Sequence, residues 1–124
     1  MLPYLYYADA RAALEFLVAA FGFTEIEAFR DDSGTVWHAQ LSTGDGVVLI
    51  GPGLEEFGTR AVDGDDRVTS RTFIYVDDVD AHYERARESG AVIVTEPSDQ
   101  GPNRIYVAQD PGGQQWIFAT PLGA

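Results

Sequence analysis

Very few side chains in this sequence could carry acid–base or metal chemistry at neutral pH. The chain contains two histidines, His38 and His82, and no cysteine. The missing cysteines exclude a disulfide framework, a thiolate metal site and a cysteine nucleophile. His38 is a candidate general base because imidazole titrates near pH 7, although a histidine that is merely hydrogen-bonded to a neighbouring strand or to a glutamate is the commoner case. The helical pattern predicts that His82 lies on the polar side of its helix.

An internal repeat supplies the elements that must position these residues. The segment Val36–Gly51 recurs as Ile105–Thr120, so that Ala39-Gln40 matches Ala108-Gln109 and each copy reads strand, glycine turn, strand. A strand, a helix and a further strand precede each copy, so the repeat covers nearly the whole chain. We therefore predict an α+β fold of two tandem βαβββ units, residues 1–51 and 69–124, joined by a connector at 52–68.

Hydrophobic periodicity and turn residues set the bounds of the predicted helices and strands. Leu14, Leu17, Val18 and Phe21 form one apolar stripe at helical spacing, and Gly22 follows as the residue that ends the helix. The polar stretch Glu96–Asn103 contains two prolines and is predicted as a loop. The predicted helices are Ala10–Phe21 and Val79–Ser89, and the predicted strands are Pro3–Ala8, Phe23–Arg30, Thr35–Ser42, Val47–Gly51, Ser70–Val76, Ala91–Thr95, Arg104–Gln109 and Gln115–Thr120.

The connector, Pro52–Val68, is rich in glycine and acidic residues and shows no sustained period. A loop of this length inside a compact domain is usually functional or mobile. We expect Leu54 and Phe57 to anchor part of it.

Composition and charge limit the partners of this protein. A chain of 124 residues is long enough for one domain with a real core. Its net charge of −12 makes nucleic acid an unsuitable partner and would attract cationic ligands. No apolar run approaches the roughly 20 residues that a membrane span needs, and no signal peptide is visible. We expect a cytoplasmic protein with neither nucleic-acid nor membrane partners.

Four stretches carry a resemblance to a known family: Pro3–Phe23, His38–Gly51, Tyr75–Ala91 and Ala108–Phe118. Together they are similar to the vicinal oxygen chelate superfamily, the glyoxalase, bleomycin-resistance and dioxygenase group. The resemblance implies a curved mixed sheet, built from the two units, around a ligand cavity. Duplicated short units also often pair across a dimer, so we expect a homodimer. The superfamily supports many unrelated activities, so the motifs are more specific for fold than for function.

The resemblance also implies where a metal would be held. In metal-dependent members the ligands come from the first and last strands of each unit, at positions that fall here on Leu2, Val48, Arg71 and Ile117, or on Leu49 in place of Val48 after a one-residue shift. None of these is a metal ligand, and Arg71 carries a positive charge. A site for Zn, Ni, Mn or Fe needs three or four convergent histidines or carboxylates. We therefore expect no metal and no other cofactor, and the resemblance is closest to the metal-free bleomycin-resistance-like members.

The same positions indicate which strand residues face the cavity, because side chains alternate between the two faces of a strand. Aromatic rings on that face could stack on a planar ligand or a cation, although aromatic residues in strands are more often core. Gln40 and Gln109, matched by the repeat, either bind a ligand or form a structural pair. Arg71 needs a partner, either an anionic ligand group or a carboxylate such as Glu25 or Glu27. The expected ligand-binding residues are Tyr4, Tyr6, His38, Gln40, Arg71, Phe73, Tyr75 and Gln109, with Trp37 added if the register shifts by one residue.

The sequence favours a binding protein over an enzyme. The resemblance to bleomycin-resistance proteins predicts sequestration of an antibiotic, and the acidic charge with concave aromatic residues suits a cationic or planar aromatic ligand. The alternative is an enzyme of this superfamily: a metal-independent isomerase or lyase that uses His38 as its base, or a metal-dependent lyase or dioxygenase. No residue is assigned as catalytic.

Overall fold

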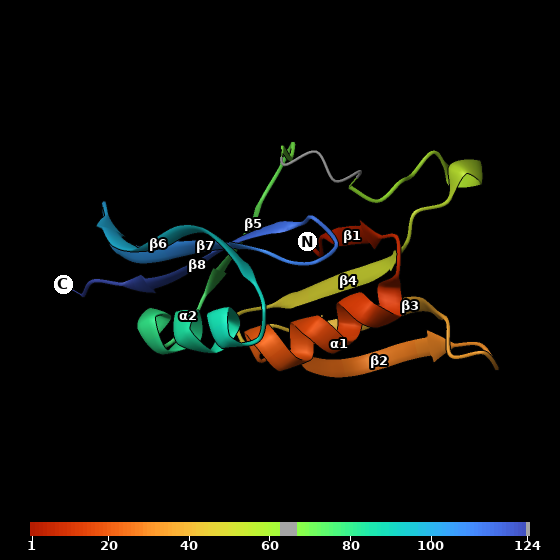
Figure 1. Ribbon diagram of the computed structural model, residues 1–124, viewed down its shortest axis with the longest axis horizontal. Coiled ribbons are helices and arrows are strands. Elements are labelled where there is room, and N and C mark those ends of the chain that lie inside the picture. The colour runs from red at the N-terminus through yellow and green to blue at the C-terminus, as the bar shows by residue number, and fades with distance from the viewer. Residues whose placement is uncertain (63–66, 124) are drawn as a thin grey trace.

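The computed structural model describes residues 1–62 and 67–123. The chain forms two βαβββ units, as the repeat predicts, and the units lie side by side along the long axis of the molecule (Figure 1). The elements are β1 (Tyr4–Tyr7), α1 (Ala10–Phe21), β2 (Thr24–Arg30), β3 (Val36–Ser42), β4 (Val47–Pro52), the 3-10 helix η1 (Glu55–Phe57), β5 (Thr72–Tyr75), α2 (Val79–Glu88), β6 (Val92–Gln100), β7 (Asn103–Gln109) and β8 (Gln115–Pro121).

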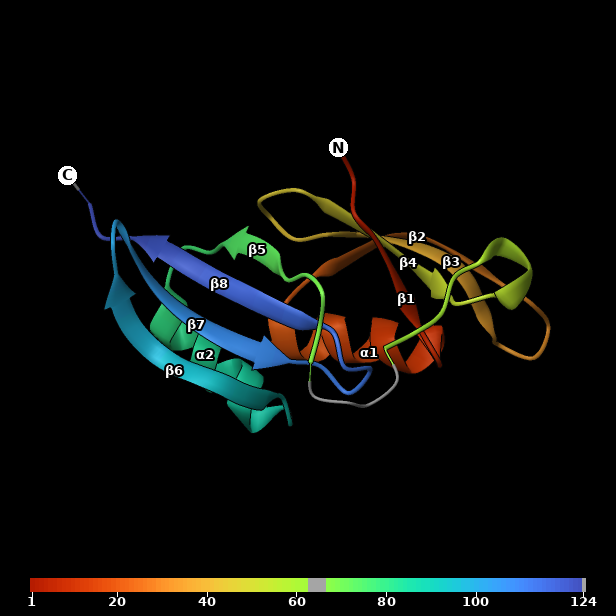
Figure 2. The same cartoon turned by 90° about the horizontal axis from the view of Figure 1, so that it is seen from above.

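Each unit contains one four-stranded mixed sheet. The strand order is β1-β4-β3-β2 in the first sheet and β5-β8-β7-β6 in the second. In both sheets the first strand of the unit pairs in parallel with the last strand, and the remaining pairs are antiparallel. The two helices lie on the same side of the molecule, so each covers one face of its own sheet (Figures 1 and 2).

Capping residues fix the bounds of the helices. The Asp9 side chain accepts a hydrogen bond of 3.1 Å from the backbone N–H of Ala12, and Gly22 ends α1 with a φ of 73°. Asp78 caps α2 in the same way through the N–H of Ala81. These bonds satisfy N–H groups that a helix leaves free at its start. The apolar stripe predicted for α1 is buried except at Val18, which is exposed.

Two predicted segments differ from the structure. Most of Glu96–Asn103 is strand rather than loop, because β6 continues to Gln100 and β7 begins at Asn103. Pro97 fits because β6 is an edge strand and its register with β7 shifts between Thr95 and Ser98, where a missing N–H costs little. In the connector, Phe57 is 73% exposed and anchors nothing, whereas Leu54 is partly buried. Residues 63–66 of the connector lie outside the described residues.

The core lies between the helices and the sheets and is continuous across the two units. Phe21 and Phe23 of the first unit contact Trp116 and Phe118 of the second, with ring centroids 4.7 to 6.4 Å apart. Burial of these rings favours the association of the two units. None of the helices in the described part of the chain is long and apolar enough to cross a membrane.

A buried polar junction also links the units. Asp110 is almost fully buried, and its Oδ2 accepts hydrogen bonds from the Tyr7 hydroxyl at 2.6 Å and from Nε1 of Trp116 at 3.0 Å. Burial raises the pKa of Asp110, and the hydrogen bonds partly oppose that rise. Burial and the neighbouring Asp110 charge raise the pKa of Tyr7. The first unit therefore supplies a donor that the second unit needs.

Candidate ligand-binding site

The uncovered face of the first sheet carries Tyr4, Gln40 and Leu49. Tyr4 and Gln40 each pair with Leu49 in the neighbouring strands, so the three side chains share one face. Val48 and Ile50 pair instead with buried residues of β3 and are themselves buried under α1. The one-residue shift considered for β4 is therefore the observed register, and Leu49 rather than Val48 faces the site.

Four side chains of the first sheet form an aromatic cluster, which we define as Tyr4, Tyr6, Phe29 and His38. The Tyr4 ring lies 5.1 Å from that of Tyr6 and 5.6 Å from that of His38, and the Phe29 ring lies 5.8 Å from His38. The Tyr4 hydroxyl is 3.1 Å from Nδ1 of His38. The structure thus brings together three expected residues and adds Phe29, which the sequence analysis missed although its hairpin pairing with His38 could have suggested it.

Gly51 permits the contact between Tyr4 and His38. Tyr4 lies on β1 and His38 on β3, and β4 runs between these strands. A Cβ atom at Gly51 would lie 2.6 Å from the Tyr4 hydroxyl oxygen and 3.2 Å from the backbone oxygen of Trp37. The absence of a side chain therefore lets the Tyr4 ring cross β4 and reach His38.

Trp37 lies at an irregularity in the strand and is not part of the cluster. The register between β2 and β3 shifts beside it, and its Nε1 donates a 3.0 Å hydrogen bond to Asp31 in the turn between these strands. Hydrogen bonds from Ser33 and Trp37 lower the pKa of Asp31 to about 2. The hydrogen bond of Trp37 to Asp31 therefore holds the turn between β2 and β3.

The uncovered face of the second sheet carries Phe73 and Tyr75, whose rings meet edge-to-face with centroids 5.2 Å apart. Beside them, Nε of Arg71 donates to the Gln115 amide oxygen at 2.9 Å, and the Gln115 amide nitrogen donates to the Gln109 amide oxygen at 3.2 Å. Arg71 therefore bonds to an amide rather than to a glutamate. Glu25, one of its two suggested partners, forms an ion pair with Arg30.

The expected residues thus fall into two groups on two sheets. Tyr4, Tyr6, His38 and Gln40 belong to the first sheet. Phe73, Tyr75 and Gln109 belong to the second, and Arg71 directly precedes its strand β5. Gln40 and Gln109, matched by the repeat, do not have equivalent places: Gln40 pairs with Leu49 two residues before the end of its hairpin, whereas Gln109 pairs with Gln115 directly beside the turn. Within one chain neither group is closed off by the other.

Two adjoining pockets are lined by residues of the connector together with residues of the sheets. The first has a volume of about 300 Å³ and lies between Tyr4, Tyr6 and the connector residues Arg60 and Arg67. The second, of about 530 Å³, extends from Arg67 to Arg71 and Gln115. Both are lined by residues 67–70, so they form one groove that runs from the aromatic cluster to Arg71.

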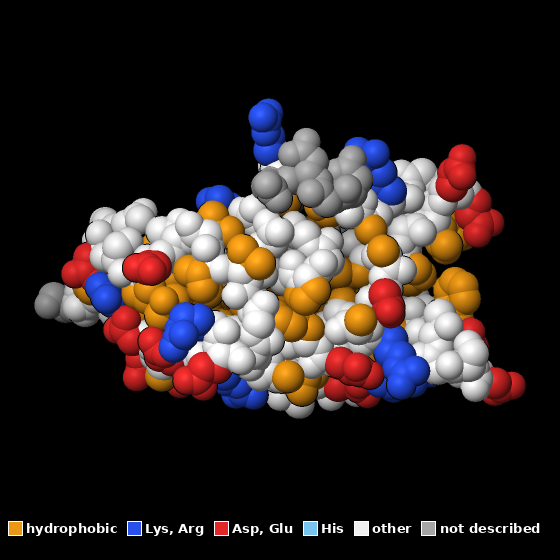
Figure 3. All heavy atoms as spheres, viewed as in Figure 1, with side chains coloured by type: hydrophobic (Ala, Val, Ile, Leu, Met, Phe, Trp, Pro, Cys, Tyr) orange, Lys and Arg blue, Asp and Glu red, His pale blue; other side chains and the backbone are white. Residues whose placement is uncertain are grey.

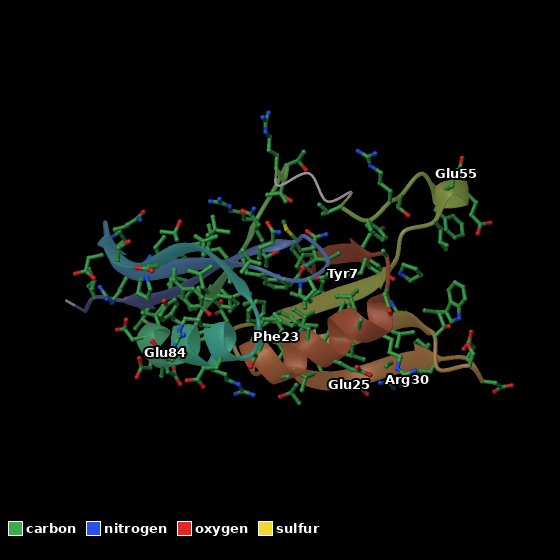
Figure 4. All side chains as sticks on the ribbon, viewed as in Figure 1. Tyr7, Phe23, Glu25, Arg30, Glu55 and Glu84 are labelled. Atoms are coloured by element: carbon green, nitrogen blue, oxygen red, sulfur yellow. The ribbon has the colours of Figure 1, made fainter. Side chains whose placement is uncertain are left out.

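His82 was predicted to lie on the polar face of its helix, and that prediction is wrong. The side chain is half-buried between the units. Its Nε2 lies 2.9 Å from the Phe21 carbonyl oxygen, which can only accept, so Nε2 carries the hydrogen and Nδ1 accepts from the Tyr106 hydroxyl. Burial lowers the pKa of His82. Sequence periodicity missed this place because α2 packs on α1 as well as on its own sheet (Figure 4). Both ring nitrogens are engaged in these internal hydrogen bonds, so His82 takes no part in the site.

The described residues contain no group of three or more His, Cys, Asp or Glu side chains that could hold a metal ion. Of the positions implied for ligands, Ile117 pairs with Phe73 on the uncovered face and Val48 is buried on the other. Apolar, amide and guanidinium groups therefore occupy the face where a metal would sit, and such groups suit an organic ligand.

Comparison with known proteins gives one family. Residues 3–118 match the family model described as the Glyoxalase/Bleomycin resistance protein/Dioxygenase superfamily. Uncharacterised proteins of Mycobacterium bovis and Mycobacterium tuberculosis are each 31% identical over 126 residues. These matches cover 97% of this chain and 82% and 73% of the two relatives.

Solved structures agree over the full length of the chain. TioX from Micromonospora sp. ML1 is 30% identical, with 100% of this chain and 97% of that chain covered and a TM-score of 0.79. TnmS3, an antibiotic binding protein from Streptomyces sp. CB03234, is 20% identical with a TM-score of 0.74, covering 97% of this chain and 93% of TnmS3. A bleomycin-binding protein from Streptomyces verticillus, complexed with copper(II)-bleomycin, is 22% identical with a TM-score of 0.67 and the same coverages. The last two likenesses show the shared fold.

Proposed function

The chain belongs to the glyoxalase/bleomycin resistance/dioxygenase superfamily, and from that premise we propose that it binds a planar aromatic small molecule and sequesters it without altering it. One observation carries the proposal: Tyr4, Phe73 and Tyr75 are 37%, 44% and 46% exposed on sheet faces that the helices leave open. Exposed rings gathered on a concave sheet offer flat apolar area for stacking. The names of two structural neighbours, an antibiotic binding protein and a bleomycin-binding protein, support a role in antibiotic resistance.

We propose that the working form is a homodimer. Within one chain each aromatic face is covered on one side only, so a bound ring would remain half in water. A two-fold pair could set the aromatic cluster of one protomer against the second sheet of its partner and make two equivalent enclosed sites. Size-exclusion chromatography with light scattering tests this: we expect twice the chain mass of 13.5 kDa, and a monomer at micromolar concentration would contradict it.

Net charge and compartment complete the proposal. The charge of −12 would steer cationic planar antibiotics toward the protein at long range. A cysteine-free, acidic chain is compatible with the cytoplasm, where we place the function.

The binding test compares two exposed phenylalanines. A panel of planar aromatic and glycopeptide antibiotics is screened by thermal shift and tryptophan fluorescence, and the best ligand is titrated into Phe73→Ala and Phe57→Ala variants. Phe73→Ala should weaken binding about tenfold, as expected for the loss of one stacked ring. Phe57 is an exposed ring outside the described pockets, so Phe57→Ala should bind like the unaltered protein. The proposal would be contradicted if no compound of the panel binds, or if both variants lose the same amount of affinity.

A second candidate function is a metal-independent isomerase or lyase. The observation that favours it is the pair formed by the Tyr4 hydroxyl and Nδ1 of His38 on the open face, where an imidazole could move a proton and a phenol could hold an oxyanion. His38→Ala separates the two functions. If His38→Ala loses turnover but keeps its affinity for the ligand, the protein is an enzyme. If neither the unaltered protein nor the variant modifies the ligand, the result supports sequestration.

A further inference from the structure

Three polar side chains form a hydrogen-bonded row on the uncovered face of the second sheet, and we define this polar row as Arg71, Gln115 and Gln109. Nε of Arg71 donates to the Gln115 amide oxygen at 2.9 Å, and the Gln115 amide nitrogen donates to the Gln109 amide oxygen at 3.2 Å. Gln109 and Gln115 pair directly in β7 and β8, so their side chains share one face. Gln115 is only 6% exposed, so its amide is held inside the protein.

Arg71 fixes the direction of the hydrogen bonds along the polar row. A guanidinium group carries only donors, whereas a glutamine amide has an oxygen that accepts and an NH2 group that donates. Gln115 must therefore turn its oxygen toward Arg71, which leaves its nitrogen for Gln109. Gln109 must then turn its oxygen toward Gln115, so its NH2 group remains as a donor. One arginine thus decides what the far end of the row can offer to a ligand.

The NH2 group of Gln109 is available for a ligand. Within residues 1–62 and 67–123, the hydrogen bond accepted from Gln115 is the only one of the Gln109 side chain, which is partly buried. The next row along the sheet is apolar and consists of Phe73, Ile117 and Val107, paired across β5, β8 and β7. Rows on one face of a sheet lie about 7 Å apart, because they are two residues apart along each strand. A ring system stacked on the apolar row therefore has its edge beside Gln109.

We propose that the polar row selects ligands with a hydrogen-bond acceptor at the edge of the ring system, so that the ligand is a planar aromatic carbonyl compound. Gln109 donates to the carbonyl oxygen, and Arg71 is a positioning residue that acts through Gln115. A ligand with an N–H group at the same edge meets a second donor, and both groups then lose their partners. The inference rests on the proposed function, since it names the ligand class of the same site.

The groups that make this selection at the ligand are neutral amides. In the view of Figure 3 the acidic side chains lie mainly over the helices and at the two ends of the molecule. The net charge of −12 attracts cations at long range and does not distinguish a neutral acceptor from a neutral donor. Uncharged probes therefore test the polar row separately from that attraction.

The test uses three neutral probes built on one tricyclic frame. 9-Fluorenone carries a carbonyl acceptor, carbazole carries an N–H donor, and fluorene carries neither. Equilibrium dialysis at pH 7 should give a Kd for 9-fluorenone about fivefold lower than for fluorene, the gain expected for one hydrogen bond between neutral groups, and carbazole should bind most weakly. Equal values for the three probes, or tightest binding of carbazole, would overturn the inference and leave the proposed function standing. Failure of all three to bind would overturn both.

Two variants exchange a donor for an acceptor within the polar row. Gln109→Glu replaces the NH2 group by a carboxylate oxygen of similar size, and Arg71→Glu replaces the donor at the start of the row by an acceptor. Both should reverse the order of affinity, so that carbazole binds about fivefold more tightly than 9-fluorenone. A merely structural role of Arg71 would instead weaken the binding of all three probes alike.

Arg87→Glu is the matched control, because it makes the same change of charge at an exposed arginine of α2. This variant should keep the order of affinity of the unaltered protein. Gln109→Glu leaves the shape of the side chain unchanged, so it tests the inference even if Arg71→Glu does not fold. If 9-fluorenone remains the tightest probe in either folded variant of the polar row, the inference is wrong.

Discussion

The two faces of the same sheets use aromatic side chains in opposite ways. On the face under the helices, Phe21, Trp116 and Phe118 are buried and contact one another across the boundary between the units. On the other face, Phe73 and Tyr75 are exposed although they lie on a strand of the same sheet as Trp116. Whether a helix covers the sheet face, and not the number of aromatic residues on it, therefore distinguishes the core from the candidate site. Covered rings should matter for stability and open rings for binding.

Phe21→Ala should give the largest loss of stability. Phe21 contacts Trp116, Phe118 and His82, so its removal leaves a cavity at the boundary between the units. We expect the free energy of unfolding to fall by about 3–5 kcal/mol, measured by urea denaturation. Phe57→Ala, the exposed control, should change it by less than about 0.5 kcal/mol. Similar values for the two variants would erase the distinction between covered and open rings.

Tyr7→Phe should cost less, and its cost should depend on pH. The change removes the hydroxyl that donates to the buried Asp110 carboxylate, so we expect a loss of about 1–3 kcal/mol at pH 7. The pKa of Asp110 is already raised by burial, so the folded state loses stability as pH rises through that pKa. Without the hydroxyl the pKa rises further, and the cost should be larger at pH 7 than at pH 4. Equal costs at both pH values would show that the hydroxyl does not stabilise the charged carboxylate.

His82→Gln should have a smaller effect that appears in the pH profile. Burial holds the folded pKa of His82 below its ordinary value of 6.5, so the neutral ring adds stability above pH 6.5 that is lost as pH falls through the lowered pKa. The variant should lack this part of the acid loss, so the difference in unfolding free energy between it and the unaltered protein should narrow from pH 7.5 to pH 5. His38→Gln, which leaves the contacts of His82 intact, serves as the control for the loss of a histidine elsewhere in the fold. A difference that stays constant with pH would place His82 in solvent.

Phe73→Ala should have the smallest effect on stability and the clearest effect on binding. Its ring is exposed, so we expect the unfolding free energy to change by less than about 0.5 kcal/mol. The affinity for a planar aromatic ligand should nevertheless fall about tenfold. If Phe73→Ala instead lost much stability and kept its affinity for the ligand, Phe73 would be a core residue and not a binding residue.

Local sequence signals predict much of this fold. Gly22 ends α1 as expected, because the end of a helix depends on residues within a few positions, and Asp9 and Asp78 cap the helix starts through equally local bonds. The repeat also predicts both sheets, but not the register, which places Gln109 beside its turn and Gln40 two residues before the end of its hairpin. These features need no knowledge of how the two units meet.

The remaining features depend on contacts between distant residues. His82 is half-buried because Phe21 and Tyr106 surround it, and no periodicity of α2 reports either neighbour. The irregular register of β2 and β3 leaves Trp37 with Asp31 and brings Phe29 to His38, which strict alternation cannot foresee. The pocket beside Tyr4 and Tyr6 likewise arises because connector residues such as Arg60 lie next to β1.

The two histidines allow the central claim to be tested in one measurement. His38 lies in the aromatic cluster on the open face, and His82 lies at the covered junction. Proton–carbon NMR of the imidazole Hε1 signals, with His82→Gln used for assignment, follows both faces while the best planar aromatic ligand of the antibiotic panel is added. Ring currents from the stacked ligand should shift the His38 signal and leave the His82 signal in place. A shift of His82 alone, or of neither histidine at saturation, would contradict binding on the open face.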